Sequence, residues 1–277
     1  MINISNLYFA YKKKKNLFNN LQCNLKNGNI YGLLGKNGAG KTTLLKIICG
    51  ILFPKEGECK VLKFESKKRH PELLANIFYL AEEFFTPRLT IKEYKSLYAP
   101  FYPCFNNDEF KYYLNEFSIE ETEKLTSLSY GQKKIFFIAF GLATNTRILI
   151  LDEPTNGMDI PSKSRLRKLL VSKITEDRLF LISTHQVRDI QQLIDPILIL
   201  DEGEIIFNKQ MEEVNKKLNV RLVSDEPDAA NCLFYEKVIG GYAVLFSDNK
   251  SMGNNVDLEI LFNAVIKNKD KLNRIFT

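Results

Sequence analysis

The chain has 277 residues, which is enough for one large domain with an appendage or for two ordinary domains. Its hydrophobic content of 45% and charged content of 26% are close to the averages of soluble globular proteins, and they argue against disordered, collagen-like and coiled-coil chains. The net charge of +6 is unevenly spread, because residues 1–69 hold 14 basic and 3 acidic side chains. This basic quarter predicts an anionic partner, such as a nucleotide, a nucleic acid or a phospholipid surface.

The first half of the chain predicts strands, one helix and then a helical segment. Residues 1–35 alternate apolar and polar side chains in short runs, which predicts two or three strands that lead into a glycine turn. The run 42–52 has helical periodicity. Residues 84–127 predict several helices, one of which begins at a capping box formed by Thr90 and Glu93.

The second half alternates strands and helices. The predicted elements are a strand at 147–152, a helix at 162–173, a strand at 179–183, a helix at 187–194 and a strand at 197–200. The first of these strands is a continuous apolar run, as in strands that are buried on both faces. The alternation predicts an α/β fold with a parallel sheet and helices on both sides.

The pattern changes after about residue 215. A hairpin with Gly240 and Gly241 at its turn is predicted there, followed by a final helix at 257–267. The predicted organisation is a main domain at 1–215, a helical subdomain within it at about 84–145, and an accessory domain at 216–277.

The cysteines and the apolar runs indicate in which cellular compartment the chain lies and whether it crosses a membrane. The five cysteines form no CxxC pair and have no metal-ligand spacing with the two histidines, which favours a reducing, cytoplasmic interior. The N-terminal residues show no secretory leader. The longest apolar runs reach nine residues, whereas a membrane-spanning helix needs about 20. We therefore expect a chain that does not cross a membrane, although it can serve one as a peripheral subunit.

A glycine-rich loop follows the predicted third strand. Its sequence GKNGAGKTT fits the pattern G-x-x-x-x-G-K-[ST], in which backbone N–H groups surround phosphate oxygens at the start of a helix. In this pattern Lys41 lies on the β- and γ-phosphates of a nucleotide, and Thr42 offers its hydroxyl to Mg²⁺. The predicted nucleotide-binding residues of the loop are Gly35, Lys36, Asn37, Gly38, Ala39, Gly40, Lys41, Thr42 and Thr43.

Three further motifs follow in order. They are LSYGQ at 128–132, ILILDEPTNGMD at 148–159 and STH at 183–185, and Ser129 lies 88 residues after Lys41. Together with the loop, they resemble the four motifs of ATP-binding cassette (ABC) ATPases over roughly residues 1–215. The resemblance implies a P-loop NTPase cassette with a mostly parallel central sheet, an N-terminal antiparallel β-subdomain and a helical insertion, and the pattern after about residue 215 adds a small C-terminal α+β tail. It also implies hydrolysis of ATP with Mg²⁺ as the cofactor.

Two adjacent carboxylates end the predicted strand at 147–152. Asp152 can hold Mg²⁺ through water, and Glu153 is free to polarise the attacking water. His185 follows the strand at 179–183, where the resemblance implies a donor to the γ-phosphate. We expect catalytic roles for Lys41, Glu153 and His185.

The LSYGQ segment implies a dimer. Ser129, Gly131 and Gln132 match signature residues that, in the family, complete the ATP site of the opposite subunit, so the resemblance implies a head-to-tail dimer with two ATP molecules. Tyr130 stands where the family usually has glycine.

Two other positions bear on the nucleotide site. Tyr11 lies 24 residues before Gly35, where the family places an aromatic side chain that stacks on adenine. Glu82 stands where the family usually has a glutamine that reaches Mg²⁺ and the γ-phosphate. A carboxylate can ligate magnesium, but it cannot donate a hydrogen bond when it is ionised. We therefore name Thr42, Asp152 and Glu82 as the candidate metal ligands.

The helical insertion is rich in aromatic residues, with 13 among the 40 positions 78–117. They can form the core of the insertion, or part of them can form an exposed groove that receives a helix of a membrane subunit. Under the second hypothesis Tyr98 and Tyr102 contact that subunit.

Three functional classes follow from the resemblance: the ATPase subunit of a membrane exporter, a soluble ABC ATPase outside transport, and a regulatory relative that does not hydrolyse ATP. The first class is favoured. The chain has only one set of motifs, and the segment between the phosphate loop and LSYGQ is too short for a long coiled coil, which argues against the standard layouts of the second class. A regulatory relative is disfavoured because Lys41, Asp152, Glu153 and His185 are all intact. The run VDLEILFNAVIK resembles the last helix of ATPases that serve exporter-type permeases. The expected partners are a polytopic permease, a second ABC subunit and the inner membrane surface, where the protein would be cytoplasmic and peripheral; no nucleic acid is expected.

Overall fold

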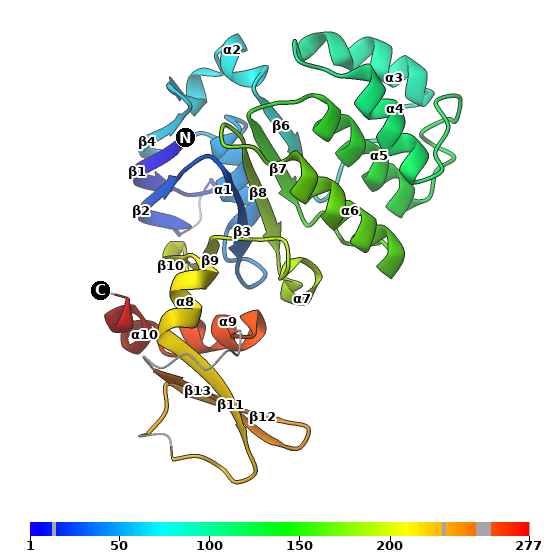
Figure 1. The fold of residues 1–277 in the computed structure, drawn as a ribbon. Helices are drawn as coiled ribbons and strands as arrows, with labels where there is room; N and C mark the ends of the chain where they lie inside the picture. The colour runs from blue at the N-terminus through cyan, green and yellow to red at the C-terminus, as the bar shows by residue number, and fades with distance from the viewer. Residues whose placement is uncertain (13–14, 229–230, 248–255, 277) are drawn as a thin grey trace.

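The computed structural model describes residues 1–12, 15–228, 231–247 and 256–276, and of Ile190 it describes only the backbone. Figure 1 shows a central sheet flanked by a small β-layer, a helical lobe and a tail below them. The strands are β1 (Ile2–Phe9), β2 (Phe18–Leu25), β3 (Asn29–Leu34), β4 (Glu56–Val61), β5 (Phe64–Glu65), β6 (Ile77–Leu80), β7 (Ile148–Asp152), β8 (Leu179–Thr184), β9 (Ile197–Asp201), β10 (Glu204–Lys209), β11 (Leu218–Val223), β12 (Phe234–Val238) and β13 (Gly241–Ser247).

The helices surround these strands. They are α1 (Lys41–Ile48), α2 (Pro71–Leu74), α3 (Ile91–Tyr98), α4 (Asn107–Glu116), α5 (Tyr130–Ala143), α6 (Ile160–Lys173), α7 (Val187–Ile190), α8 (Met211–Lys217), α9 (Leu258–Lys267) and α10 (Lys269–Ile275), with 3₁₀ turns at Ser66–Lys68 and Ala99–Phe101. None of the helices in the described ranges combines the length and the hydropathy of a bilayer-spanning segment.

The central sheet has six strands in the order β10-β9-β3-β8-β7-β6, and only the β9–β10 pair is antiparallel. A second, antiparallel sheet has the order β2-β1-β4-β5. The predicted α/β class with a mostly parallel sheet and an N-terminal antiparallel layer is therefore confirmed.

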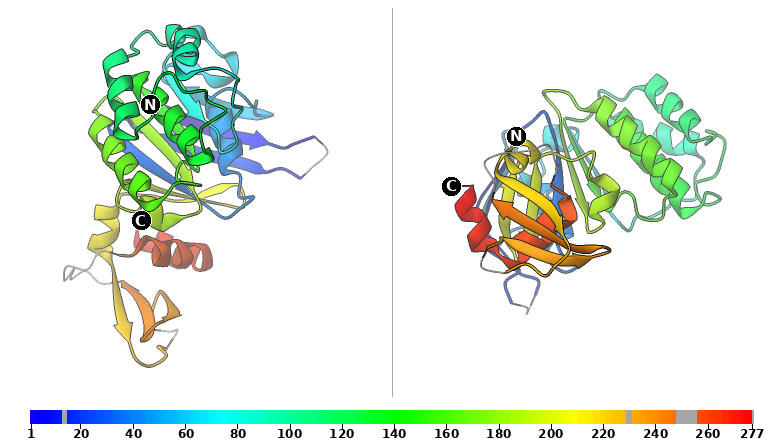
Figure 2. Two further views of the ribbon diagram at one scale, coloured as in Figure 1. Left: turned by 90° about the vertical axis from the view of Figure 1, so that its right-hand side faces the viewer. Right: turned by 60° about the horizontal axis from the view of Figure 1, so that its bottom comes forward.

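The parallel strands are apolar except near their ends because both of their faces are covered. All five side chains of β7 and all six of β8 are buried. One face packs against α5 and α6, and the other packs against α1 and the antiparallel sheet. Figure 2 shows the same layers from two other directions.

The parallel register brings the functional motifs to one edge. In the ladder Leu34 pairs with Thr184, Asp152 with Ser183, and Leu80 with Leu151. The carboxyl ends of β3, β8, β7 and β6 therefore meet at the same edge, and this is where ligands bind in open α/β sheets.

Most predicted elements are confirmed, including the capping box of α3, in which the Thr90 hydroxyl accepts from the Glu93 N–H and the Glu93 carboxylate accepts from the Thr90 N–H. The helix predicted at 187–194 is shorter, since α7 ends at Ile190. Beyond it, the Asp195 N–H donates to the Ile30 carbonyl, at 2.8 Å, which ties the chain to the sheet. Helix α10 was not predicted.

The tail consists of the sheet β11-β13-β12 with α9 and α10 beside it. The predicted hairpin β12–β13 and the predicted helix α9 are both present. The boundary at residue 215 falls inside α8, and one hydrophobic core cluster continues from the central strands into α9. We propose that 1–215 and 216–277 are two units joined through α8.

Candidate functional site

The loop between β3 and α1 is built around glycines. Gly40 has φ of 108°, in the left-handed region, and a Cβ at this position would lie 2.8 Å from the Phe18 ring. At Gly35 a Cβ would lie 2.5 Å from the Leu200 carbonyl oxygen. These two positions let the backbone turn tightly before α1 begins at Lys41.

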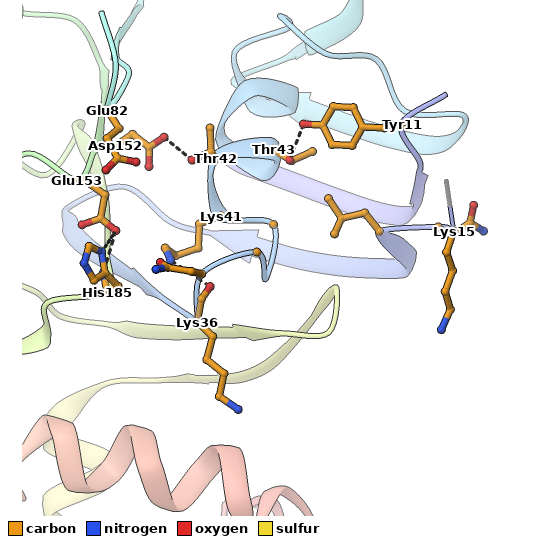
Figure 3. Close-up of a pocket in the computed structure, with 15 residues that line it drawn as sticks. Tyr11, Lys15, Lys36, Lys41, Thr42, Thr43, Glu82, Asp152, Glu153 and His185 are labelled. Carbon is orange, nitrogen blue, oxygen red and sulfur yellow. Dashed lines mark hydrogen bonds and ion pairs between the residues drawn. The ribbon is translucent and has the colours of Figure 1, made fainter. Parts of the chain in front are cut away.

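A cavity of about 890 Å³ opens above this loop (Figure 3). Its walls contain most of the predicted site residues together with three that were not predicted. The lining residues are Tyr11, Lys15, Asn16, Leu17, Lys36, Asn37, Gly38, Gly40, Lys41, Thr42, Thr43, Glu82, Asp152, Glu153 and His185. Of the predicted residues, Gly35, Ala39, Ser129, Gly131 and Gln132 are not among them.

Lys41 lies at the bottom of the loop. Its Nζ donates to the Gly35 carbonyl at 2.7 Å and to the Lys36 carbonyl at 3.4 Å. Burial lowers the pKa of Lys41, and the carboxylates of Glu153, Asp152 and Glu82 oppose this shift. The ammonium is therefore a poorly hydrated positive charge that faces three carboxylates.

Thr42 and Asp152 come together from two different elements. The Thr42 hydroxyl at the start of α1 donates to Asp152 Oδ2 at 2.7 Å, and the Ser183 hydroxyl donates to the other carboxylate oxygen. A hydroxyl oxygen beside a carboxylate is a donor set that suits Mg²⁺. The residues present therefore fit the ion that the sequence predicts here.

Glu153 is buried and held by several partners. Its Oε1 lies 2.7 Å from His185 Nδ1 and accepts from the His185 N–H at 2.9 Å, while its Oε2 accepts from the Thr184 hydroxyl at 3.1 Å. The backbone of Glu153 has φ of 48°, an uncommon value for a residue with a side chain. The sequence predicted Glu153 and His185 as site residues but did not predict their direct contact.

Lys134 is a functional candidate that sequence reasoning missed. This side chain on α5 is fully buried, and its Nζ donates to the Glu153 carbonyl at 2.7 Å. The available signal was a lysine at the start of the apolar run IFFIAF, where a buried face is expected. Lys134 ties the helix that follows the LSYGQ segment to the backbone of Glu153.

Burial gives Lys134 a testable pH dependence. Burial lowers the pKa of Lys134 from its ordinary value of 10.5. Between the lowered pKa and 10.5, Lys134 therefore binds more protons in the unfolded chain than in the folded chain. The contribution of Lys134 to the free energy of unfolding rises with pH over that range. We expect the wild type to gain stability relative to Lys134→Met as the pH rises toward 10.5, which urea titrations at a series of pH values measure. Exposed Lys168→Met is the control; a constant difference between wild type and Lys134→Met would contradict the prediction.

Tyr11 and Glu82 lie on opposite sides of the cavity (Figure 3). The exposed Tyr11 hydroxyl is 2.9 Å from the Thr43 hydroxyl, and its ring meets Phe9 edge to face at 5.0 Å. Glu82 follows β6, and its Oε1 accepts from Asn156 Nδ2 at 3.2 Å. Glu82 and Asp152 both line the cavity.

The LSYGQ residues lie at the N-terminus of α5, outside the cavity wall. The Ser129 hydroxyl accepts from the Gln132 N–H at 3.2 Å, and Gln132 Oε1 accepts from the Ser129 N–H at 2.9 Å, which forms a capping box. A Cβ at Gly131 would lie 2.7 Å from the Gly157 carbonyl oxygen. Within one chain, the structure brings together the loop, Asp152, Glu153 and His185, but not the signature segment.

Comparisons with known proteins agree with this arrangement. The family model described as "ABC transporter" matches residues 18–156. "ABC transporter ATP-binding protein YtrB" of Bacillus subtilis is 31% identical over 195 residues, and the match covers 70% of this chain and 66% of YtrB, just under two thirds of that relative. "Bacitracin transport ATP-binding protein BcrA" of Bacillus licheniformis is 31% identical over 221 residues, covering 78% of this chain and 72% of BcrA.

A solved structure agrees as well. The dimeric ATP-binding cassette MJ0796, in a post-hydrolysis state bound to ADP and Pi, superposes with a TM-score of 0.66 at 25% identity. The superposition covers 76% of this chain and 98% of that one.

Proposed function

Because this chain belongs to the ABC transporter family of ATP-binding proteins, we propose that it binds and hydrolyses ATP to drive a separate membrane permease. Proteins of this family are ATPases. The observation that carries the proposal is that three features meet at one cavity of about 890 Å³: the glycine loop with Lys41, the Thr42–Asp152 pair and the Glu153–His185 pair. A cavity of this size suits a small-molecule ligand.

The loop and α1 would hold the phosphates. Backbone N–H groups of 36–43 and the positive end of α1 favour anionic oxygens. The Lys41 ammonium, which rests on the Gly35 and Lys36 carbonyls, can exchange these partners for phosphate oxygens of higher negative charge. Tyr11 would stack on the adenine, which its exposed position at the cavity rim supports.

Thr42 and Asp152 would hold Mg²⁺, with Glu82 as a third candidate on the same side of the cavity. When bound, the ion would neutralise charge on the phosphate oxygens. Glu82 can accept but not donate when ionised, so it would act only as an oxygen ligand or as an acceptor from water.

Glu153 would take the proton from the attacking water. Its carboxylate is fixed by Thr184 and His185, so little reorganisation is needed at the moment of reaction. His185 touches the same carboxylate oxygen through Nδ1, which leaves the rest of its half-exposed ring free to reach the γ-phosphate.

A second cassette would complete the site. Ser129, Gly131 and Gln132 do not line the cavity of their own chain, which supports the expectation that they meet nucleotide on another subunit. The similarity to a dimeric cassette bound to ADP and Pi supports the same arrangement. The partner can be a second copy of this chain or a sister cassette.

We propose that the permease docks on the helical insertion. Of the 13 aromatic residues at positions 78–117, Phe78, Phe110 and Tyr113 are buried in the core, whereas Phe85, Tyr98, Phe101 and Tyr112 are exposed. Tyr102 is partly buried and contacts the rings of Phe78 and Phe140, so it fits the alternative in which these aromatic residues form a core. The exposed rings around Tyr98 and Phe101 are the better candidates for contact with the permease.

This docking surface can be tested directly. We expect Tyr98→Ser with Phe101→Ser, at side chains that are 40% and 68% exposed, to lower the recovery of co-expressed permease in pull-downs by at least about tenfold, because interface aromatic residues carry much of the binding energy. Tyr112→Ser, at 54% exposure on α4, is the matched control. Equal recovery with the double variant and the wild type would exclude this surface.

We propose export as the direction and the inner face of the cell membrane as the location. The relative named for bacitracin transport and the resemblance of α9 to the last helix of exporter-type ATPases support export. Inverted membrane vesicles that contain the chain and its permease provide the test, because their cytoplasmic face is outward. An exporter moves cargo into the vesicles when ATP is added, which mass spectrometry of the lumen detects. Cargo leaving the vesicles would indicate import, and a chain that never co-purifies with a membrane protein would favour the soluble alternative.

A further inference from the structure

Tyr130 departs from the family pattern and has contacts of its own. It is the first residue of α5 and occupies the signature position where glycine is usual. Its side chain is 48% exposed, so it is only partly covered. Its covered side contacts the segment that follows β6, the segment that follows β7 and Lys134 of its own helix.

The first contact reaches the segment that follows β6. The Tyr130 hydroxyl donates to the Glu82 carbonyl at 3.0 Å. The ring stacks on Phe84 with centroids 5.6 Å apart and planes 18° apart, and Phe84 in turn meets Phe137 of α5 edge to face at 4.9 Å.

The other contacts reach the segment that follows β7. Lys134, one helical turn after Tyr130, places its Nζ 5.2 Å from the centre of the ring and donates to the Glu153 carbonyl. A Cβ at Gly157 would lie 2.7 Å from Tyr130 Cδ1, so the ring packs directly on that glycine. Tyr130 therefore lies between the Glu82 segment and the 153–157 segment.

Glu82 is consequently held at two points. Tyr130 fixes its main chain, and Asn156, next to Gly157, donates to its carboxylate at 3.2 Å. A glycine at position 130 could provide neither the hydroxyl nor the stacked ring. The substitution at the signature and the unusual carboxylate at position 82 thus belong to one connected group of contacts.

We propose that Tyr130 is a positioning residue that fixes the Glu82 segment, so that the Glu82 carboxylate stays aimed at the divalent cation that accompanies ATP. This inference rests on the proposed function. Tyr130 is also the first residue of α5, whose signature residues would meet the nucleotide of the second cassette. It would therefore connect the nucleotide contact of the second cassette with the residues that would hold the cation in its own chain.

Tyr130→Phe tests the inference because it removes only the hydroxyl and keeps the ring. The first measurement is hydrogen–deuterium exchange of the amides of 82–85 in the chain without nucleotide. The second is the affinity of the ATP-loaded chain for Mn²⁺, followed by electron paramagnetic resonance, with a non-hydrolysable ATP analogue. Both are repeated in a Glu82→Ala background, and thermal unfolding confirms that each variant is folded.

We expect Tyr130→Phe to speed exchange at 82–85 and to weaken Mn²⁺ binding by about three- to tenfold, the range for loss of one hydrogen bond. We also expect the Mn²⁺ effect to disappear in the Glu82→Ala background, because Tyr130 acts through Glu82. Tyr112→Phe, which removes an exposed hydroxyl elsewhere, is the control and should change neither measurement.

Unchanged exchange at 82–85, or the full Mn²⁺ effect persisting in the Glu82→Ala background, would overturn the inference. If the wild type binds neither the ATP analogue nor Mn²⁺, the proposed function fails and with it the role in cation binding. The exchange data then still decide whether Tyr130 fixes the Glu82 segment.

Discussion

Replacing Glu153 with glutamine is expected to lower the rate of ATP hydrolysis by about 10²- to 10⁴-fold, the usual contribution of a general base. The amide keeps the size of the side chain and can still contact Thr184 and His185, but it cannot take a proton from water. ATP binding should therefore be preserved, and a closed dimer should accumulate. Steady-state phosphate release and size-exclusion chromatography with ATP measure the two effects.

Glu176→Gln is the matched control for that experiment. Glu176 is an exposed glutamate outside the cavity, and its substitution should leave hydrolysis unchanged. Normal turnover in Glu153→Gln would remove Glu153 from the role of base. Loss of ATP binding in the same variant would show that the carboxylate acts on binding instead.

Replacing Lys41 with alanine is expected to weaken ATP binding by about 10- to 150-fold, which corresponds to the loss of one strong charge-assisted hydrogen bond. The Lys41 ammonium is buried beside the loop, where it donates to the Gly35 and Lys36 carbonyls. Isothermal titration calorimetry with ATP and Mg²⁺ gives the dissociation constant.

Two comparisons make the Lys41 result specific. Lys168→Ala removes an exposed lysine of α6 and should bind ATP like the wild type. Urea unfolding of Lys41→Ala without nucleotide shows whether the variant is folded. A folded Lys41→Ala chain that binds ATP as tightly as the wild type would exclude the loop as the phosphate site.

Structural features that depend on neighbouring residues could be predicted from the sequence. The continuous apolar runs of β7 and β8 predicted buried parallel strands, and the loop at 35–43 predicted the turn into α1. Asp152, Glu153 and His185 follow two neighbouring strands, so their gathering at one sheet edge follows from the parallel arrangement itself.

Contacts between distant segments could not be predicted in this way. The bond of Lys134 to Glu153 joins residues 19 positions apart, and that of Tyr130 to Glu82 joins residues 48 positions apart. The sequence pattern of Lys134 and Tyr130 does not indicate which residue each of them contacts. Only tertiary packing brings the two members of each pair together. The early end of α7 at Ile190 was likewise not predicted.

We propose that ATP is hydrolysed in the cavity between the glycine loop and β7. The most direct measurement follows radiolabelled ATP mixed with the wild-type chain and Mg²⁺ and separates ATP from ADP and phosphate over time. We predict formation of ADP and phosphate that stops when EDTA removes the metal ion. ATP that stays bound but intact over the whole range of Mg²⁺ concentrations would contradict the account.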